Sequence, residues 1–379
     1  MAKQIILAVA GSGKTYYICN SINTDKKNLI LAYTNENISN IKRELIDAHG
    51  CIPNLTNIMT FDSFIYRYLI CPYEPTILEY FGKSKFKRKG ITTMDPPPMQ
   101  IKLPNGKRVP NPKYSKKECL GHYVSKDGRY YCSNLSELLM FVKDNGRPLM
   151  IKITENLNKF YDQIMIDEFQ DFRKHNYDLI IALSKGINNV LLVGDFYQHS
   201  VSAVNNSGKP FKKGKNEITY QEFIALLKKE RFKIDDKQLL KSRRCSSYIC
   251  DYVKNKLQIQ IESCNNSYGK VIWVKDNIQE VLENDSIIKL VYQKAKAYAF
   301  TAVNWSYSKG DTLSNVCVIL TKTFEDLDKD TFFCSKIPTS TINKLYVAMT
   351  RTKGNLYLIK ASDFDKVKRN YENNNKRPH

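Results

Sequence analysis

Two segments about 150 residues apart constrain the fold of this chain more than any other feature. The first, AVAGSGKT at Ala8–Thr15, follows the short apolar stretch Gln4–Ala8. The second, IMIDEFQD at Ile164–Asp171, is an apolar run that leads into two adjacent acids. Short apolar runs bounded by turns are typical of strands buried in a parallel sheet. The pair predicts an α/β fold with parallel sheets, in which Ile164–Ile166 lies beside Gln4–Ala8.

The first segment, called here the phosphate loop (Ala8–Thr15), has the chemistry of a polyphosphate site. Gly11 and Gly13 allow a tight turn whose backbone N–H groups point inward at an anion. Lys14 would reach the β- and γ-phosphates, and the Thr15 hydroxyl would complete a magnesium shell. A helix predicted from about residue 15 to 23 would place its positive end under the same phosphates. A chance glycine-rich turn is the alternative.

The second segment supplies the acids that such a site needs. Asp167 would bind Mg²⁺, and Glu168 would orient and deprotonate the attacking water. The alternative is a surface acidic turn after a core strand. Together the two segments predict a P-loop enzyme that hydrolyses ATP with Mg²⁺.

The charge distribution predicts a polyanionic partner. The formal net charge is +21, and the basic segment Lys83–Lys117 contains eleven Lys or Arg and one acid, Asp95. Pro96–Pro98 within it favours an extended, loop-rich surface over a packed helix. We expect this surface to bind DNA, with a solvated basic loop as the alternative. Its candidate contacts are Lys85, Lys87, Arg88 and Lys89.

Cysteine usage and hydropathy bear on location. Ten cysteines are scattered without a framework, and no stretch resembles a signal peptide or is long enough to span a membrane. We therefore expect free thiols in a reducing cytoplasm and no membrane partner. Tyr123–Ser133 is predicted to be a β-hairpin that turns at Asp127 and Gly128. The alternative there is a zinc site assembled from Cys71, Cys119, His122 and Cys132.

Seven segments in order resemble UvrD/Rep-type superfamily 1 DNA helicases, over nearly the whole chain. The resemblance implies two RecA-like P-loop domains, the first interrupted by a small basic accessory insertion. The similar segments after the phosphate loop are Leu29–Asn35 with a helix at Ile38–Ala48, Thr60–Phe64, Asp167–Asp171, Val193–Gln198, Leu240–Ser246, Tyr307–Thr312 and Leu345–Lys353.

The resemblance also implies roles for individual residues. Gln198 would sense the γ-phosphate, while Arg244 and Arg351 would reach across a domain cleft as arginine fingers, worth roughly 10³–10⁵ in rate. The implied nucleotide-binding residues are Ala10, Gly11, Ser12, Gly13, Lys14, Thr15 and Gly310, with Thr15 and Asp167 at the metal. The implied DNA contacts are Tyr33, Thr34, Asn35, Thr60, Phe61 and Ser63. For Phe61 and Phe64 a core position is the alternative, and we favour it for Phe64.

The predicted layout follows the same family. The first motor domain comprises residues 1–70 and 150–235, the insertion 71–149, the second motor domain 236–365, and a disordered tail 366–379. The chain departs from the family in four places. Only seven residues precede Ala8, so Gln4 is not expected to be the equivalent of the glutamine that reads adenine in the family, and the preference for ATP over other NTPs stays open. About 60 residues separate Arg244 from Tyr307, too few for a second large accessory domain. No aromatic residue follows Gln198 within the next six positions, and Thr312 replaces a glutamate.

The function implied is an ATP-dependent DNA translocase or helicase that moves 3′→5′ on single-stranded or tailed DNA. The compact length keeps a second class open, in which a DNA-activated ATPase gates a nuclease or other protein subunit in a phage-defence or repair complex. A third class is a DNA-binding protein with a vestigial nucleotide site.

Overall fold

The computed structural model describes residues 2–199, 208–265, 268–308 and 310–374. Its contacts divide the chain into two compact units. Unit 1 comprises Met1–Gln4, Ile18–Asp167 and Phe172–Leu192, and unit 2 comprises Ile5–Tyr17, Glu168–Asp171 and Val193–His379. The phosphate loop therefore belongs to unit 2. The boundaries predicted for the two motor domains stay a prediction.

A six-stranded sheet has the order β14-β1-β11-β10-β2-β3. The pairs β10–β11, β10–β2 and β2–β3 are parallel, as predicted. The prediction that Ile164–Ile166 lies beside the first strand is wrong, because β11 lies between them. Ile164 pairs with Val190 of β11 and with Leu29 of β2, so both edges of β10 are already used. The strands are β1 (Ala2–Leu7), β2 (Asn28–Ala32), β3 (Thr56–Thr60), β10 (Gln163–Ile166), β11 (Asn189–Gly194) and β14 (Lys233–Asp235).

The two helices predicted here, at about residues 15–23 and 38–48, follow β1 and β2 as α1 and α2. Thr34 caps the second helix by accepting a hydrogen bond from the Asn37 amide, and Gly50 ends it with a φ of +75°. A left-handed residue at this position is typical of glycine because it has no Cβ. Strand β2, which lies between α1 and α2 in the sequence, is buried along its whole length. The helices are α1 (Lys14–Ser21), α2 (Asn35–His49), α6 (Leu149–Phe160) and α7 (His175–Gly186).

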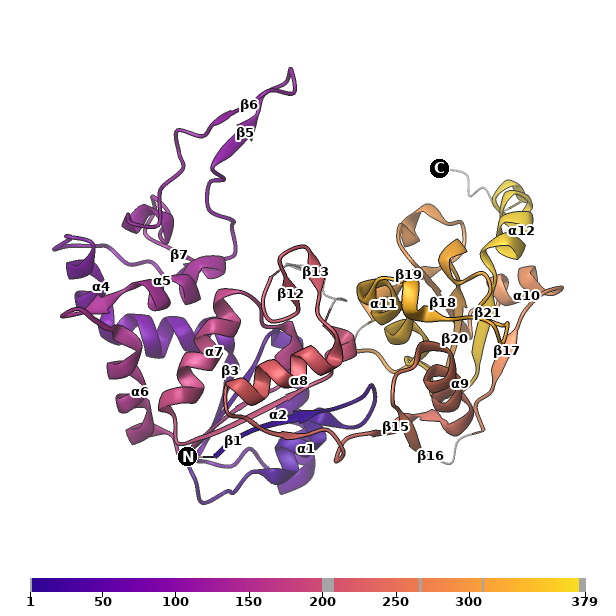
Figure 1. Cartoon of the computed structure of the whole chain (residues 1–379), viewed down its shortest axis with the longest axis horizontal. Helices are drawn as coiled ribbons and strands as arrows, with labels where there is room; N and C mark the ends of the chain where they lie inside the picture. Colours follow the sequence, from indigo (N-terminus) through magenta and orange to yellow (C-terminus); the bar gives the residue numbers. More distant parts are fainter. Residues whose placement is uncertain (1, 200–207, 266–267, 309, 375–379) are drawn as a thin grey trace. The chain divides into compact units, whose positions relative to one another are not determined.

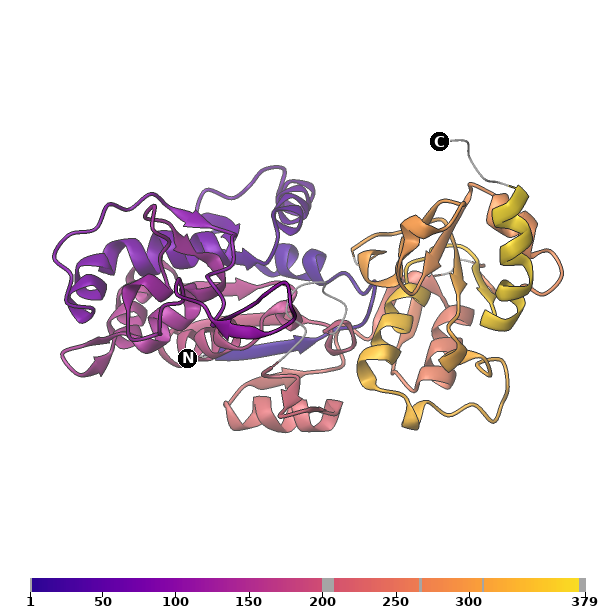
Figure 2. The ribbon, with the colours of Figure 1, turned by 90° about the horizontal axis from the view of Figure 1, so that it is seen from above.

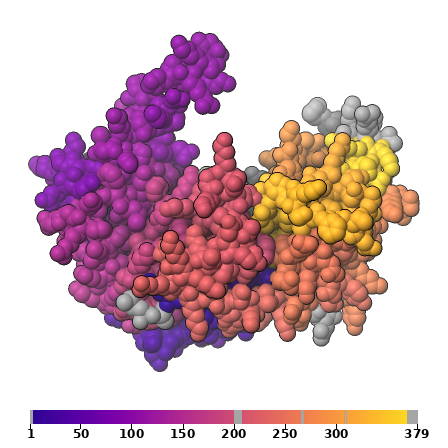
Figure 3. All heavy atoms as spheres, viewed as in Figure 1, coloured from indigo at the N-terminus to yellow at the C-terminus, as the bar shows by residue number. Residues whose placement is uncertain are grey.

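Residues 71–149, which lie in unit 1, contain the extended basic surface that was predicted. The basic segment Lys83–Lys117 has no helix, and its β5–β6 hairpin extends away from α4, α5 and β7 (Figure 1; Figure 3). The elements from motif-like Thr60–Phe64 onward are α3 (Phe61–Phe64), the π-helix η1 (Ile65–Ile70), η2 (Cys71–Tyr73), α4 (Glu74–Tyr80), β4 (Ile91–Thr92), β5 (Gln100–Lys102), β6 (Arg108–Pro110), η3 (Leu120–His122), β7 (Tyr130–Tyr131), η4 (Cys132–Asn134), α5 (Leu135–Phe141), β8 (Lys143–Asp144) and β9 (Arg147–Pro148).

The predicted turn at Asp127 and Gly128 is confirmed. The Ser125 amide donates to Arg129 O at 2.8 Å, and Val124 bridges Tyr130 in antiparallel fashion. Gly128 has a φ of +88°, and a Cβ there would lie 2.2 Å from Lys87 O.

Within the part of the chain that the structure describes, no three His, Cys, Asp or Glu side chains are arranged to hold a metal ion.

Unit 2 contains a second, five-stranded parallel sheet with the order β17-β21-β20-β18-β19. Some of its buried residues, with those of α9 and α11, form a hydrophobic core that includes Trp305 and Tyr346, and others pack in a second cluster with α10. The elements are η5 (Phe169–Asp171), η6 (Phe196–Gln198), β12 (Lys212–Lys213), β13 (Asn216–Glu217), α8 (Tyr220–Lys229), β15 (Lys241–Ser246), α9 (Ser247–Leu257), β16 (Glu262–Asn265), β17 (Val271–Trp273), α10 (Ile278–Glu283), β18 (Ile287–Val291), η7 (Ala295–Ala297), β19 (Ala302–Asn304), η8 (Trp305–Ser308), β20 (Asn315–Ile319), η9 (Lys322–Phe324), η10 (Cys334–Lys336), α11 (Thr339–Met349), β21 (Leu356–Ile359) and α12 (Ala361–Asn374).

The prediction of a disordered tail from residue 366 is wrong as far as residue 374. Helix α12, yellow in Figures 1 and 2, continues to Asn374. Phe364 is 4% exposed and packs with Ile278 and Leu282 of α10, and Val367 lies against the same cluster. Two apolar anchors one turn apart thus order a segment whose composition is otherwise polar. Residues 375–379 lie outside the described residues.

Two further observations bear on the sequence predictions. All ten cysteines are free thiols. Among the described residues, no helix combines the length and the apolar character needed to cross a bilayer.

Candidate active site

Backbone hydrogen bonds connect the phosphate loop of unit 2 to the end of β11 and to β15. Ala8 N donates to Gly194 O at 2.8 Å, and Arg243 N donates to Gly11 O at 2.8 Å. Gly11 and Gly13 have φ values of +72° and +85°, which confirms the predicted turn. A Cβ on Gly11 would lie 2.7 Å from the Arg244 Cβ. Only glycine fits here, because the neighbouring backbone and β15 approach so closely.

The phosphate-loop lysine contacts the acid predicted to be the general base. Lys14 Nζ lies 3.3 Å from Glu168 Oε1, with both side chains mostly buried. Glu168 has a φ of +53°, a left-handed backbone that is uncommon for a residue with a Cβ. The Gln170 amide donates to Glu168 Oε2, and its own carbonyl accepts from the Asp195 amide at 2.9 Å. Gln170 therefore joins Glu168 to the segment after β11.

That segment orients Gln198 through Asp195. Gln198 Nε2 donates to Asp195 Oδ2 at 2.8 Å. The hydroxyl of Tyr346 donates to the same oxygen at 3.2 Å and accepts from Ala10 N at 2.7 Å. Burial raises the pKa of Asp195 to about 6, against the opposing effect of Lys14. Neither Asp195 nor Tyr346 was among the predicted site residues, although Asp195 sits in the segment that resembles the helicase pattern.

The two predicted arginine fingers lie in unit 2 with the phosphate loop. Arg244 donates from Nε to Thr312 Oγ1 at 3.0 Å and from Nη1 to Thr350 O at 3.1 Å. Thr312, where the family has a glutamate, therefore fixes an arginine instead. Arg351 donates from Nε to Val347 O at 3.0 Å.

Arg351 has a further property that indicates a missing anionic partner. Its side chain is 2% exposed, and its Nη2 is buried without a hydrogen-bond partner among the described residues. Burial and the nearby charge of Arg244 lower the pKa of Arg351 to about 10, so it stays charged at neutral pH. A buried, charged and incompletely bonded guanidinium fits a phosphate oxygen, because leaving such a donor unsatisfied is unfavourable.

The predicted metal ligands occupy two places in the chain. Asp167 follows β10 in unit 1, is 1% exposed, and its amide donates to Leu31 O at 2.9 Å. Thr15 opens α1 beside Lys14. Carboxylate and hydroxyl oxygens are donors of the kind that Mg²⁺ prefers, so each of these two side chains suits a divalent ion. Gly310 has a φ of +96°, and nothing described lies within 4 Å of where its Cβ would be.

A stacked pair beside the phosphate loop was missed by the sequence prediction. The Arg243 guanidinium lies 4.4 Å from the centroid of the Tyr16 ring, and Tyr16 directly follows Thr15. The two residues come from the helix after the phosphate loop and from β15. Aromatic and guanidinium planes are the surfaces on which nucleobases stack. A signal was present in the sequence, since Tyr16 adjoins the loop and Arg243 adjoins Arg244.

The predicted nucleic-acid contacts in unit 1 are mostly accessible. Thr34 and Asn35 are exposed at the start of α2, while Tyr33, Thr60 and Ser63 are half-buried. The assignment of Phe61 is corrected. Its ring is 1% exposed and packs 4.8 Å from that of Phe172, so it belongs to the core. Phe64 is core as favoured. The six residues after Gln198 include no aromatic residue of the kind that stacks on DNA in the family. Five of them, at 200–204, lie outside the described residues.

The four basic candidates differ in their surroundings. Lys85, Lys87 and Lys89 are exposed. Arg88 is also exposed but pairs with Glu74 at 3.5 Å and lies 5.9 Å from the centroid of the Tyr66 ring. Arg88 therefore attaches the basic segment to α4 and η1, in addition to any contact with a phosphate.

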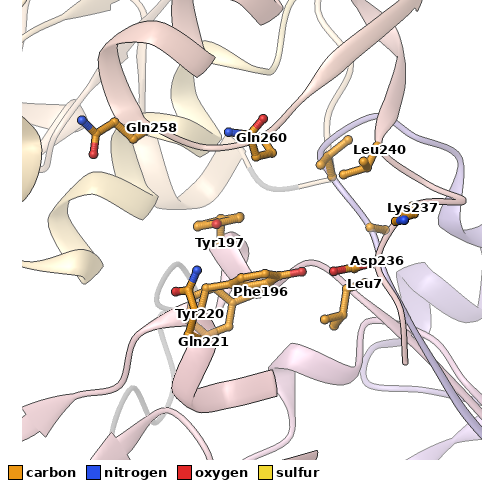
Figure 4. Close-up of a pocket in the computed structure, with 12 residues that line it drawn as sticks. Leu7, Phe196, Tyr197, Tyr220, Gln221, Asp236, Lys237, Leu240, Gln258 and Gln260 are labelled. Carbon is orange, nitrogen blue, oxygen red and sulfur yellow. The ribbon is translucent and has the colours of Figure 1, made fainter. Parts of the chain in front are cut away.

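A pocket of about 340 Å³ in unit 2 adjoins the start of the phosphate loop. Figure 4 shows Tyr197 and Tyr220 on one side and Gln258 and Gln260 on the other. The rings of Tyr197 and Tyr220 stack at 5.6 Å. None of the residues at 10–15 lines this pocket, so it is separate from the predicted phosphate cradle.

Comparisons with known proteins agree with this arrangement. A family model described as an AAA domain matches residues 2–203, and one described as the viral superfamily 1 RNA helicase core domain matches residues 136–360. Each covers more than half of the 379 residues. A search of curated protein sequences found no significant match.

Solved structures give a weaker likeness. A complex of arterivirus nonstructural protein 10, a helicase, with DNA aligns over 96% of this chain at 13% identity and a TM-score of 0.45. The PRRSV helicase aligns over 95% at 14% identity and a TM-score of 0.43. The chain spans 61% and 52% of the length of these two proteins.

The family models decide the assignment, and the finer likeness to UvrD/Rep-type members stays a prediction. Two models that overlap at residues 136–203 cover the chain from residue 2 to residue 360. The α/β fold with parallel sheets is the one predicted. The chain belongs to superfamily 1 of the helicases, a family of NTP-hydrolysing enzymes.

Proposed function

We propose that this chain is an ATP-dependent motor that moves 3′→5′ along single-stranded DNA and unwinds tailed duplexes. One observation carries the proposal: unit 2 holds the phosphate loop, Glu168, Gln198 and the two arginines, and polar contacts through Gln170 and Asp195 join the first three. Lys14 contacts Glu168, and Asp195 contacts Gln198. These are the groups that phosphoryl transfer requires, namely a cation for the phosphates, a base for water, a sensor and arginine fingers.

Each group has a separate task in ATP hydrolysis. The phosphate-loop amides and Lys14 would hold the β- and γ-phosphates. Glu168 would accept a proton from the attacking water. Arg244 and Arg351 would neutralise the charge that grows on the transferred phosphoryl group. Thr15 and Asp167 would hold Mg²⁺, which supplies further neutralisation of the phosphate oxygens when bound.

The nucleobase is proposed to stack on Tyr16 and Arg243. Their 4.4 Å contact presents an aromatic face and a guanidinium plane next to the phosphate loop. Stacking tolerates any base because every base has a π-face. We therefore expect ATP to be used with little discrimination against other NTPs.

The polynucleotide is proposed to contact Thr34, Asn35, Thr60 and Ser63, with the exposed lysines of the basic segment adding phosphate contacts. Hydroxyls and amides suit phosphate oxygens, and lysines provide charge. One matching family model is described as an RNA helicase core. DNA and RNA are therefore the two substrates to be compared.

The deciding experiment measures ATP turnover by the purified protein with and without single-stranded DNA or RNA, alongside Lys14→Ala. Stimulation by DNA that is lost in the variant supports the proposal, and strand displacement on 3′- and 5′-tailed duplexes then gives polarity. Stimulation by RNA alone would reassign the substrate. Absence of turnover with every polynucleotide would refute a free-standing motor.

A second function is favoured by the compact second sheet. The described residues between Arg244 and Tyr307 form α9, β16, β17, α10, β18, η7 and β19, and none of these elements forms an inserted accessory domain. A motor without that domain is suited to act as a DNA-activated ATPase that gates a nuclease or another subunit. Strong DNA-stimulated turnover without strand displacement would favour this function over unwinding.

A further inference from the structure

Tyr346 has a hydroxyl that bridges two parts of the active site. The residue lies on α11, five positions before Arg351, and its side chain is fully buried. Its hydroxyl accepts from Ala10 N in the phosphate loop at 2.7 Å and donates to Asp195 Oδ2 at 3.2 Å. One oxygen thus hydrogen-bonds to both a buried amide and a buried carboxylate.

The ring of Tyr346 is fixed independently of these hydrogen bonds. It belongs to the core of unit 2, between Leu345 and Val347, and meets the Tyr197 ring edge-on at 5.9 Å. Burial raises the pKa of Tyr346 well above its ordinary value, so the hydroxyl keeps its proton and remains a donor to Asp195. Packing in the core therefore fixes the position of the hydroxyl. Because the hydroxyl keeps its proton, it is the donor in the hydrogen bond to Asp195.

Asp195 passes this constraint on to Gln198. Its Oδ2 accepts from Gln198 Nε2 at 2.8 Å as well as from Tyr346, and its Oδ1 accepts from Tyr197 N at 2.9 Å. Nε2 carries a second N–H that can donate to a phosphate oxygen, and the side-chain carbonyl oxygen of Gln198 can accept from water. The orientation of this amide therefore depends on a carboxylate that Tyr346 helps to hold.

Helix α11 contacts the same region at two other points on one face. Asn343 Nδ2 lies 3.3 Å from His199 Nδ1, and Ser340 N donates to Glu217 Oε2 at 2.7 Å. Positions 340, 343 and 346 are spaced by three, which places them along one side of a helix. The side of α11 that carries Tyr346 is thus the side that meets the segments after β11.

We propose that Tyr346 is a positioning residue for phosphoryl transfer: its hydroxyl ties the phosphate loop at Ala10 to Asp195 and thereby fixes the amide of Gln198. Tyr346 touches no reacting atom and acts through these two partners. The inference rests on the proposed ATP hydrolysis, and it adds that α11 governs that site through a tyrosine hydroxyl as well as through Arg351.

The first test is Tyr346→Phe, which keeps the ring and removes only the hydroxyl. We expect kcat for ATP to fall roughly 10- to 100-fold, the range that corresponds to losing a buried hydrogen bond to a charged group. KM and the affinity for a fluorescent ATP analogue should stay within about threefold, because the phosphate-binding groups remain. A merely structural loss would instead lower the melting temperature and leave kcat per folded molecule unchanged.

Tyr357→Phe is the matched control, since Tyr357 is a half-buried tyrosine on β21 that contacts none of these groups. The second test is a cycle of Tyr346→Phe, Asp195→Asn and the double variant. If Tyr346 acts through Asp195, the double variant loses no more than the worse single variant.

Additive losses, or a Tyr346→Phe enzyme with wild-type kcat, would overturn the inference while leaving the proposed function intact. A wild-type chain without turnover would overturn both.

Discussion

Lys14 and Glu168 are ion-paired: Lys14 Nζ lies 3.3 Å from Glu168 Oε1, in the unit that also holds Gln198 and Arg351. One residue belongs to the phosphate loop and the other follows a strand about 150 positions later. The contact places the cation that would hold the phosphates against the carboxylate that would activate water. A nucleotide that recruits Lys14 therefore also changes the charge beside the general base.

The first prediction concerns that carboxylate. Glu168→Gln keeps the shape of the side chain and removes its basicity. We expect ATP turnover to fall by about 10²–10⁴-fold, the contribution of a positioned general base, while nucleotide binding persists. Steady-state phosphate release and equilibrium binding of a fluorescent nucleotide measure the two effects separately. Retained turnover would sink the assignment of Glu168.

The second prediction concerns Arg351. The lysine of Arg351→Lys keeps the positive charge but lacks the planar guanidinium group. Its ammonium group therefore cannot direct several N–H donors at fixed angles. We expect kcat to drop by roughly 10³-fold or more, as for an arginine finger. Arg173→Lys, which changes a buried arginine of unit 1, is the control for general damage to folding. Equal losses in turnover per folded molecule would argue against a finger role.

The third prediction concerns pH. Burial raises the pKa of Asp195 from 3.8 to about 6, so the folded state binds this proton more tightly than the unfolded chain. The contribution of Asp195 to the free energy of unfolding therefore decreases as pH rises from about 4 to 6 and is constant above. Turnover should run the opposite way, because protonated Asp195 no longer accepts from both Gln198 and Tyr346. We expect kcat to fall as pH drops through about 6.

The pH profile of Asp195→Asn checks that assignment. An asparagine carries no titrating proton, so its lower activity should lack the limb near pH 6. A variant profile with the same limb as the wild type would place the titration on another group.

The fourth prediction concerns the basic segment. Replacing Lys85, Lys87 and Lys89 by Ala should weaken binding to single-stranded DNA. The slope of log K against log salt should become shallower by about 0.7 per lost phosphate contact. Arg88→Ala should also lower thermal stability, because it removes the contacts with Glu74 and Tyr66. Salt titrations of DNA binding decide the matter, and an unchanged slope would return the lysines to a solvated surface.

The fifth prediction concerns the nucleobase. Tyr16→Ala should raise KM for ATP and GTP alike by roughly tenfold or more, since base stacking contributes ~1–3 kcal/mol. Tyr16→Phe keeps the ring and should behave like the wild type. Competition assays with the four NTPs give the discrimination directly. A strong preference for ATP that survives Tyr16→Ala would show that another group reads the base.

The local elements around the site could be predicted from sequence because their signals are local. The strand before the phosphate loop, the turn at Gly11 and Gly13 and the helix after it occupy about 20 consecutive residues and agree with the structure. The hairpin turn at Gly128 was likewise found from adjacent residues. The segment-by-segment resemblance placed Arg244 and Arg351, which the structure brings into the unit of the phosphate loop.

Features that depend on neighbours remote in sequence were missed. The order of strands along the sequence does not determine which strands become neighbours in the sheet. The position of β11 between β1 and β10 was therefore not predicted. For Phe61 a core position could be named only as an alternative, and the burial of Phe364 in α12 was not predicted, because these depend on Phe172 and on α10.

The sequence by itself determined the chemistry of this protein: a lysine, two acids, a glutamine and two arginines in helicase order. Only the tertiary structure decided how they are connected. Ala10 and Tyr346 are 336 positions apart in the sequence. Ala10 N lies 2.7 Å from the Tyr346 hydroxyl because the fold of unit 2 brings the phosphate loop and α11 together. Backbone turns are fixed by neighbouring residues, whereas contacts over such separations depend on how the entire core packs.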